Sequence, residues 1–245
     1  MKYKAVTKYI FLSALSLMAL ITLSGSKASA LTLADLLGGQ SVTIDDKIFY
    51  NFTGWQSVSG GGAEALDPSR ITVTPIDTII NGVREIGLLF TTPGFFVTSG
   101  QDIDILFEFS VRTDPLQELI VDDYLKVAGG ISGNGLALAL ETVLDENGNY
   151  INALSAGFDA NGGRAEDIAY FDPQDILHII KDIQVYAPSS GFCAQDRWNC
   201  TAGISHFYQL FSQRPPLDVP EPSSLFLLGF GLAGLAVARR KCTGK

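Results

Sequence analysis

The cysteines are the first side chains in this sequence to consider for chemistry. Cys193 and Cys200 lie seven positions apart, and Cys242 follows a cluster of basic residues near the end of the sequence. If the chain is exported to an oxidising compartment, an isolated pair at this spacing predicts a disulfide that closes one small loop. A zinc site would need two more ligands close by, and His206 alone does not supply them.

The histidines and the glycine-rich stretch give no catalytic pattern. His178 and His206 lie in or beside strand-like segments, and no serine in a Gly-x-Ser-x-Gly elbow accompanies them. We therefore interpret both as structural residues. Residues 129–135 are rich in glycine but lack a following Lys-Ser or Lys-Thr pair. This pattern indicates a loop and not a phosphate cradle.

The carboxylates are numerous, but no pair of them stands out. The sequence has 26 Asp and Glu residues. The two carboxylates of a glycoside hydrolase are paired in space and not in sequence, so the sequence does not single out one pair. We interpret Asp102, Asp104, Asp122 and Asp123 as solvated surface acids, with a calcium site in a loop or at a sheet edge as the alternative. We predict no catalytic residue, no metal ligand and no cofactor.

Residues 145–149 (Asp-Glu-Asn-Gly-Asn) resemble the opening of a calcium loop, but a hairpin turn is the better interpretation. An EF-hand loop needs Gly at its sixth position and a bidentate Glu at its twelfth. Counted from Asp145, Gly148 is the fourth residue and Ala156 the twelfth. The Asn147-Gly148 pair supplies the positive φ angles of a tight turn. We therefore predict a β-hairpin at this position.

The first 30 residues are typical of a secretory signal peptide. Three lysines among the first eight residues precede an apolar run over residues 9–23. Ala28 and Ala30 flank Ser29 in a small-x-small cleavage site, which predicts a mature chain that begins near Leu31. An uncleaved membrane anchor is the alternative.

The last 26 residues combine an extended motif, an apolar span and a basic end. Pro220-Glu221-Pro222 cannot continue a helix and is expected to be extended. The 16 uncharged residues from Ser223 to Ala238 would form a helix about 24 Å long, short of the ~30 Å hydrocarbon core. The cluster Arg239-Arg240-Lys241 would stay on the cytoplasmic side as a basic stop. An ordinary C-terminal membrane anchor is one interpretation of this pattern.

This three-part tail resembles the PEP-CTERM sorting signal of Gram-negative bacteria. The resemblance rests on Pro220-Glu221-Pro222, the glycine-rich apolar span and Arg239-Arg240-Lys241. It implies an exosortase-type processing enzyme as a partner, and the inner membrane as a partner of the C-terminal helix before processing. It also implies a final location at the cell surface or outside the cell, in a setting of exopolysaccharide or biofilm-like material.

The exported part is strongly acidic once both ends are set aside. Residues 31–222 hold 9 Lys and Arg and all 26 Asp and Glu residues, a net charge of −17, against −9 for the whole chain. This charge argues against nucleic acid and anionic lipid head groups as partners. It permits neutral or cationic glycans and divalent cations.

The segments that must position these side chains are mainly strands. In residues 102–112, Ile103, Ile105, Phe107, Phe109 and Val111 alternate with mostly polar residues and predict a strand with one buried face. Other strands are predicted over residues 42–44, 47–55, 71–75, 85–91, 136–144, 150–158, 179–187 and 204–211. A short helix is expected over residues 31–37, with Thr32 as its cap and Gly38-Gly39 at its end.

These elements predict an all-β protein with an antiparallel β-sandwich or jelly-roll-like ectodomain. Residues 33–39, 46–49, 51–52, 67–73, 181–183 and 204–212 resemble a recurrent ectodomain of PEP-CTERM proteins, whose biochemical function is unassigned. The resemblance agrees with this fold and implies no activity.

The predicted organisation has four parts. They are a signal peptide (1–30), the ectodomain (31–215), a Pro-rich linker with the PEP motif (216–222) and a transmembrane sorting segment with its basic stop (223–245). We expect a non-enzymatic, exported surface or matrix protein linked to exopolysaccharide. A carbohydrate-binding module, with or without calcium, is the alternative, and a hydrolase is a third hypothesis that would need two close carboxylates in a cleft.

Overall fold

The computed structural model describes residues 31–114, 118–189 and 200–214. The predicted signal peptide, the linker with the PEP motif, the C-terminal segment and Cys193 lie outside these residues. Within the described ranges, no helix has both the length and the apolar character needed to cross a bilayer.

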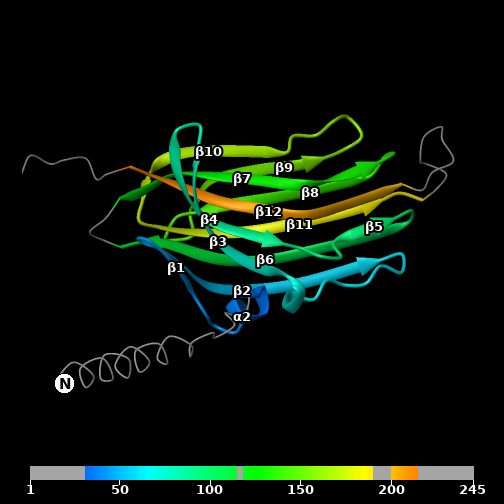
Figure 1. Ribbon diagram of the computed structural model, residues 1–245, viewed down its shortest axis with the longest axis horizontal. Coiled ribbons are helices and arrows are strands. Elements are labelled where there is room, and N and C mark those ends of the chain that lie inside the picture. The colour runs from blue at the N-terminus through cyan, green and yellow to red at the C-terminus, as the bar shows by residue number, and fades with distance from the viewer. Residues whose placement is uncertain (1–30, 115–117, 190–199, 215–245) are drawn as a thin grey trace, which may run out of the picture. The chain divides into compact units, whose positions relative to one another are not determined.

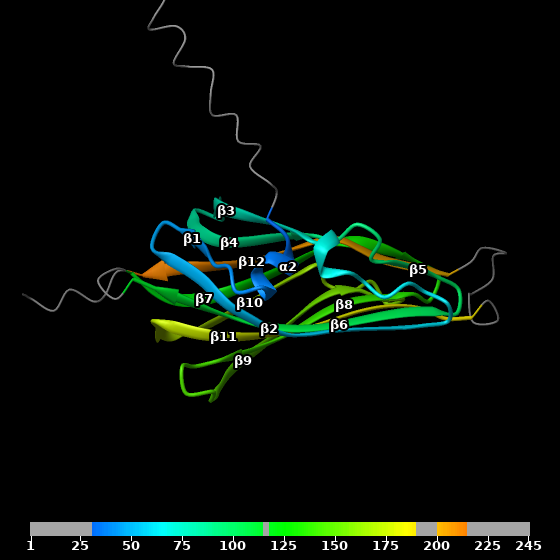
Figure 2. The ribbon, with the colours of Figure 1, turned by 90° about the horizontal axis from the view of Figure 1, so that it is seen from below.

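Two antiparallel sheets, packed face to face, contain the described strands (Figures 1 and 2). Sheet I has, in spatial order, β1 (Val42–Ile44), β2 (Lys47–Gly60), β6 (Gln101–Thr113), β11 (Ile176–Ala187), β8 (Leu136–Leu144) and β9 (Tyr150–Phe158). Sheet II has β10 (Glu166–Gln174), β7 (Leu119–Ser132), β12 (Thr201–Arg214), β4 (Val83–Thr91) and β3 (Thr72–Ile80), and β5 (Phe96–Thr98) pairs with β12. The prediction of an antiparallel sandwich is therefore confirmed.

Strand β6 shows how the sequence pattern produces the sheet. Ile103, Ile105, Phe107, Phe109 and Val111 are each at most 1% exposed, whereas the residues between them are mostly half-buried or exposed. Because side chains alternate between the two faces of a strand, these five residues all point into the space between the sheets. The strand predicted from this alternation is confirmed.

A cluster of aromatic rings joins the two sheets in the core. The ring of Phe107 on β6 lies 6.3 Å from Trp55, 5.7 Å from Phe90 and 6.5 Å from Phe207, measured between centroids. Phe90 on β4 and Phe207 on β12 stack at 4.7 Å. Because Phe107 belongs to sheet I and the stacked pair to sheet II, these contacts hold the layers together through large apolar surfaces.

The short helix α2 (Leu33–Leu37) covers part of this core and has the predicted cap. The Thr32 hydroxyl accepts a hydrogen bond from the Asp35 amide at 3.2 Å, and the Asp35 carboxylate accepts one from the Thr32 amide at 2.9 Å. This reciprocal capping box satisfies two free amides at the start of the helix. Leu33 and Leu36 are fully buried.

The hairpins follow from local turn chemistry. Strands β8 and β9 are joined at residues 145–149, where the Asp145 carboxylate accepts bonds from the amides of Asn147 and Asn149, both at 2.8 Å. The Asn149 side chain also donates to this carboxylate, at 2.8 Å, and its bond together with the backbone bonds lowers the pKa of Asp145. Strands β3 and β4 are joined by Asn81-Gly82, both with positive φ, as a two-residue turn requires.

Candidate functional site

A groove of about 610 Å³ lies on sheet II. Its walls come from the β3–β4 hairpin, from β10 and from Arg164, and its floor comes from β4, β7 and β12. On β7, Asp122 and Tyr124 line the groove, whereas the alternate residues Asp123 and Leu125 are fully buried. Because side chains alternate along a strand, the groove is on the outer face of sheet II, away from the aromatic core.

Two buried carboxyl groups lie in the floor of the groove. Asp122 accepts a hydrogen bond from the Ser212 amide at 2.7 Å and another from the Ser212 hydroxyl. Glu85 is 3% exposed, and its Oε2 atom has no hydrogen-bond partner among the described residues. Burial and the nearby charge of Asp122 raise the pKa of Glu85 to about 8, against the opposing effect of Lys47. Glu85 therefore keeps its proton at neutral pH.

The walls of the groove carry an aromatic ring and several charges. The Tyr124 hydroxyl donates a hydrogen bond of 2.6 Å to Glu166 Oε2, and Lys126 Nζ lies 3.0 Å from the same atom. Both contacts lower the pKa of Glu166, so this carboxylate is charged. Arg164 pairs with Asp167. Tyr170 on β10 is 71% exposed and offers an open ring beside these groups.

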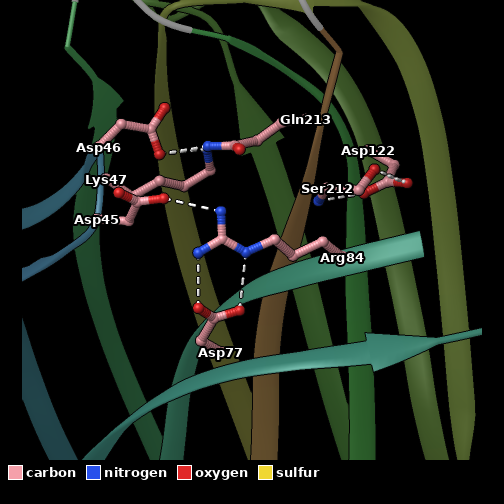
Figure 3. Close-up of polar contacts among 8 residues, drawn as sticks. All are labelled: Asp45, Asp46, Lys47, Asp77, Arg84, Asp122, Ser212 and Gln213. Carbon is pink, nitrogen blue, oxygen red and sulfur yellow. Dashed lines mark hydrogen bonds and ion pairs between the residues drawn. The ribbon is translucent and has the colours of Figure 1, made fainter. Parts of the chain in front are cut away.

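Polar groups next to the groove connect the two sheets at one end of the sandwich (Figure 3). Arg84 on β4 forms a two-point contact with Asp77, at 3.0 and 2.6 Å, and reaches Asp45 between β1 and β2 at 2.8 Å. Lys47 is fully buried, with its Nζ atom 3.6 Å from Asp46 Oδ1. Burial lowers the pKa of Lys47 to about 8, and the charge of Asp46 opposes this shift.

The acids that the sequence singled out are not all solvated. Asp122 and Asp123 are 3% and 0% exposed, so interpreting them as solvated surface residues is wrong. Both lie on β7, which the sequence pattern missed, and their polar partners come from strands far away in sequence. Asp104 is half-buried, and burial together with the neighbouring Asp182 raises its pKa.

The histidines and the cysteine lie outside the groove. His178 Nδ1 lies 2.7 Å from the Ser110 hydroxyl, and His206 packs edge-on against Tyr208. Cys200 is buried and disulfide-bonded. Its predicted partner, Cys193, lies outside the described residues, so this pairing stays a prediction. In the part of the chain that is described, no three His, Cys, Asp or Glu residues come together in a way that could hold a metal ion.

Comparison with protein families identifies the end of the chain. A family model described as the PEP-CTERM protein-sorting motif matches residues 218–241. The chain carries a PEP-CTERM sorting motif. The motif indicates an exported, secreted protein and implies processing by an exosortase. It includes Pro220-Glu221-Pro222 and Arg239-Arg240-Lys241, and the resemblance found in the sequence is confirmed.

The match to the PEP-CTERM motif covers residues 218–241 and does not include the β-sandwich. No curated protein matches the sequence. Similar solved structures include the enzymatically active domain of tailspike protein 4 of bacteriophage CBA120, with 14% identity and a TM-score of 0.25. This match covers 64% of the present chain and 19% of the tailspike chain.

Two carbohydrate-binding modules are also among the similar structures. TmCBM61 in complex with β-1,4-galactotriose has 10% identity and a TM-score of 0.26, with 63% of this chain and 86% of that chain covered. The family 11 module from Clostridium thermocellum, in complex with a mixed-linked tetrasaccharide, has 12% identity and a TM-score of 0.16, with 71% and 99% covered. At these TM-scores the similarities carry no argument about this chain.

Proposed function

We propose that this protein is a non-enzymatic component of the cell surface or extracellular matrix that binds polysaccharide in the groove of sheet II. The sorting motif supports delivery to the outside of the cell, where such material lies. The observation that carries the binding proposal is the exposed ring of Tyr170 beside the charged groups of Arg164, Glu166 and Asp167. An aromatic face can stack on a sugar ring, and the charged groups around it can hydrogen-bond to sugar hydroxyls.

The test is a binding titration against a panel of soluble polysaccharides with two tyrosine variants. We expect Tyr170→Ala to weaken binding about tenfold, because an aromatic contact contributes about 1–1.5 kcal/mol. Tyr150→Ala is the matched control, since Tyr150 is 66% exposed but does not line the groove. Failure of the unmodified protein to bind any member of the panel would refute binding. An equal loss in both variants would refute the groove as its site.

Adding a chelator distinguishes polysaccharide binding that needs calcium from binding that does not. A calcium-supported module would lose its affinity when a chelator is added, and calcium would restore it. Binding through the described side chains alone would be unchanged. The same titration, with and without the chelator, distinguishes these results.

Processing of the sorting motif is tested at the end of the chain. We expect the protein isolated from a host with a working exosortase to end near Pro220–Pro222, as shown by peptide mapping. Recovery of peptides from residues 239–245 in the mature protein would show instead that the tail remains as a simple membrane anchor.

A glycoside hydrolase is the second candidate, and one observation favours it. The groove holds Glu85, which is protonated at neutral pH, and Asp122 beside it. Glycoside hydrolysis needs one protonated carboxyl group as the acid and a second carboxylate as base or nucleophile. Release of reducing ends from a bound polysaccharide, lost in Glu85→Gln, would establish this activity. The non-enzymatic proposal requires that no reducing ends are released.

A further inference from the structure

A second group of polar side chains lies in the core, between the sheets and away from the groove. It contains Asp123 on β7, Glu141 on β8, Lys181 on β11 and Gln209 on β12, all at most 2% exposed. Glu141 and Lys181 are cross-strand neighbours in sheet I, whereas Asp123 and Gln209 come from sheet II. Nothing in the proposed functions above uses these four residues.

The contacts place a lysine amine directly against an amide carbonyl group. Lys181 Nζ donates to Gln209 Oε1 and to Glu141 Oε2. The amide nitrogen of Gln209 donates to Glu141 Oε1 at 2.9 Å and to Asp123 Oδ1. The Phe207 ring centroid lies 5.9 Å from Nζ. The amine, the amide and the two carboxyl groups therefore form one connected unit in an apolar surrounding.

This cluster contains a second carboxyl group and an amide in addition to the ion pair of Lys181 and Glu141. One lysine faces two carboxyl groups, and Asp123 Oδ2 is buried without a hydrogen-bond partner among the described residues. Burial and the charge of Glu141 raise the pKa of Asp123 well above its usual value. Asp123 therefore holds a proton more readily than an ordinary aspartate does, and it lies beside the amide nitrogen of Gln209. Glu141 contacts both the amine and the amide.

We propose that Lys181 and Gln209 form an intramolecular isopeptide bond that links the two sheets. Gln209 is the acyl group because its uncharged amide contacts Nζ directly. Glu141 and Asp123 move the protons. The dry core suits the reaction because it keeps out the water that would hydrolyse the amide.

The reaction balances without any additional reagent. Glu141 takes a proton from the ammonium group of Lys181, and the free amine attacks the Cδ atom of Gln209. The new Nζ–Cδ bond forms, and the bond between Cδ and Nε2 breaks as Asp123 gives its proton to the leaving nitrogen. Asp123 then regains a proton from Nζ, and the proton held by Glu141 leaves with ammonia as ammonium. One amide is exchanged for another, and no oxidant or reductant is needed.

The test is high-resolution mass spectrometry of the full chain after denaturation and reduction of the disulfide. We expect a mass about 17 Da below the value for the sequence between the mapped ends, the loss of one ammonia. Proteolysis should yield a peptide with Lys181 covalently joined to the peptide with Gln209. The unmodified mass with two separate peptides would overturn the proposal.

The same spectra decide which group reacts. A loss of about 18 Da, with a junction at Asp123 or Glu141, would mean that water left instead, and it would overturn the assignment of Gln209. Glu141→Gln removes the proton acceptor with little change of shape, so we expect this variant to fold and to keep the unlinked mass. Lys126→Arg, at a partly exposed lysine, is the matched control and should keep the link. A linked Glu141→Gln variant would overturn the role of Glu141.

Discussion

Single buried ionisable groups make the stability of this protein depend on pH. Glu85 has a raised pKa of about 8 because its charged form is desolvated. Between about pH 4.5 and pH 8 the unfolded chain has lost this proton and the native state keeps it. The native state therefore binds more protons, and its contribution to stability falls as the pH rises through this window.

We predict that Glu85→Gln removes this dependence. The variant should match the unmodified protein below about pH 4.5 and be more stable by on the order of 2 kcal/mol at pH 8 to 9, since one pKa unit corresponds to about 1.4 kcal/mol and water penetration reduces the ideal value. Urea unfolding over a pH series measures the difference. Glu64→Gln, at an exposed acid, is the control and should follow the unmodified protein.

The contribution of Lys47 to stability changes with pH in the opposite direction from that of Glu85, and it does so at higher pH. Burial lowers its pKa to about 8, so between about pH 8 and its ordinary value of 10.5 the unfolded chain binds the extra proton. Stability contributed by this residue rises with pH in that window and is lost as the pH falls through 8. Taken together, Glu85 and Lys47 place the least favourable pH for this end of the sandwich near 8.

At the scale of the strand, the backbones of β4 and β12 approach so closely that only glycine fits at one position. Gly87 on β4 pairs with Leu210 on β12, and a Cβ atom there would overlap the backbone oxygen of Gln209. We predict that Gly87→Ala separates β4 from β12 and lowers the free energy of unfolding by about 3 kcal/mol or more. Chemical denaturation measures the loss.

A second glycine on the same sheet serves as the control for this prediction. A Cβ atom added to Gly130 on β7 would meet no other described atom within 4 Å, and this glycine has no positive φ. Gly130→Ala should therefore change the stability by less than about 0.5 kcal/mol. Equal effects of the two substitutions would contradict the steric explanation.

The strands differ in how well the sequence predicts them, and β6 and β7 show why. On β6, the residues between the five buried apolar side chains are polar except Leu106, so the period of two is visible. On β7, Asp122, Asp123 and the pair Gly129-Gly130 hide that period. The two acids fit on β7 because of tertiary contacts: Ser212 and Gln209 on β12 supply their hydrogen-bond partners. Sequence spacing does not show such contacts, and for the same reason it shows neither the groove nor the four core residues.

At the scale of the whole molecule, stability depends on contact between the sheets. Phe107 touches rings from both sheets and is 1% exposed. We predict that Phe107→Ala lowers the free energy of unfolding by about 3–5 kcal/mol, because it leaves a cavity in the middle of the core. Phe107→Leu should cost less than half of that amount. Val58→Ala, at a residue that is 62% exposed, should have little effect in the same assay, and a comparable loss there would contradict this assignment.

The position of β12 sets an order of events during synthesis. This strand is the last one described in the chain, yet it lies between β4 and β7 in the middle of sheet II, four residues before the matched sorting motif begins. Because a polypeptide is synthesised from its N-terminus, β12 is the last of the described strands to be made, and the edges of β4 and β7 that it pairs with stay unpaired until then. The central pairing of sheet II is therefore completed by the segment that lies directly before the matched sorting motif. The ectodomain reaches its full set of strand pairs only when almost the whole chain up to that motif is available.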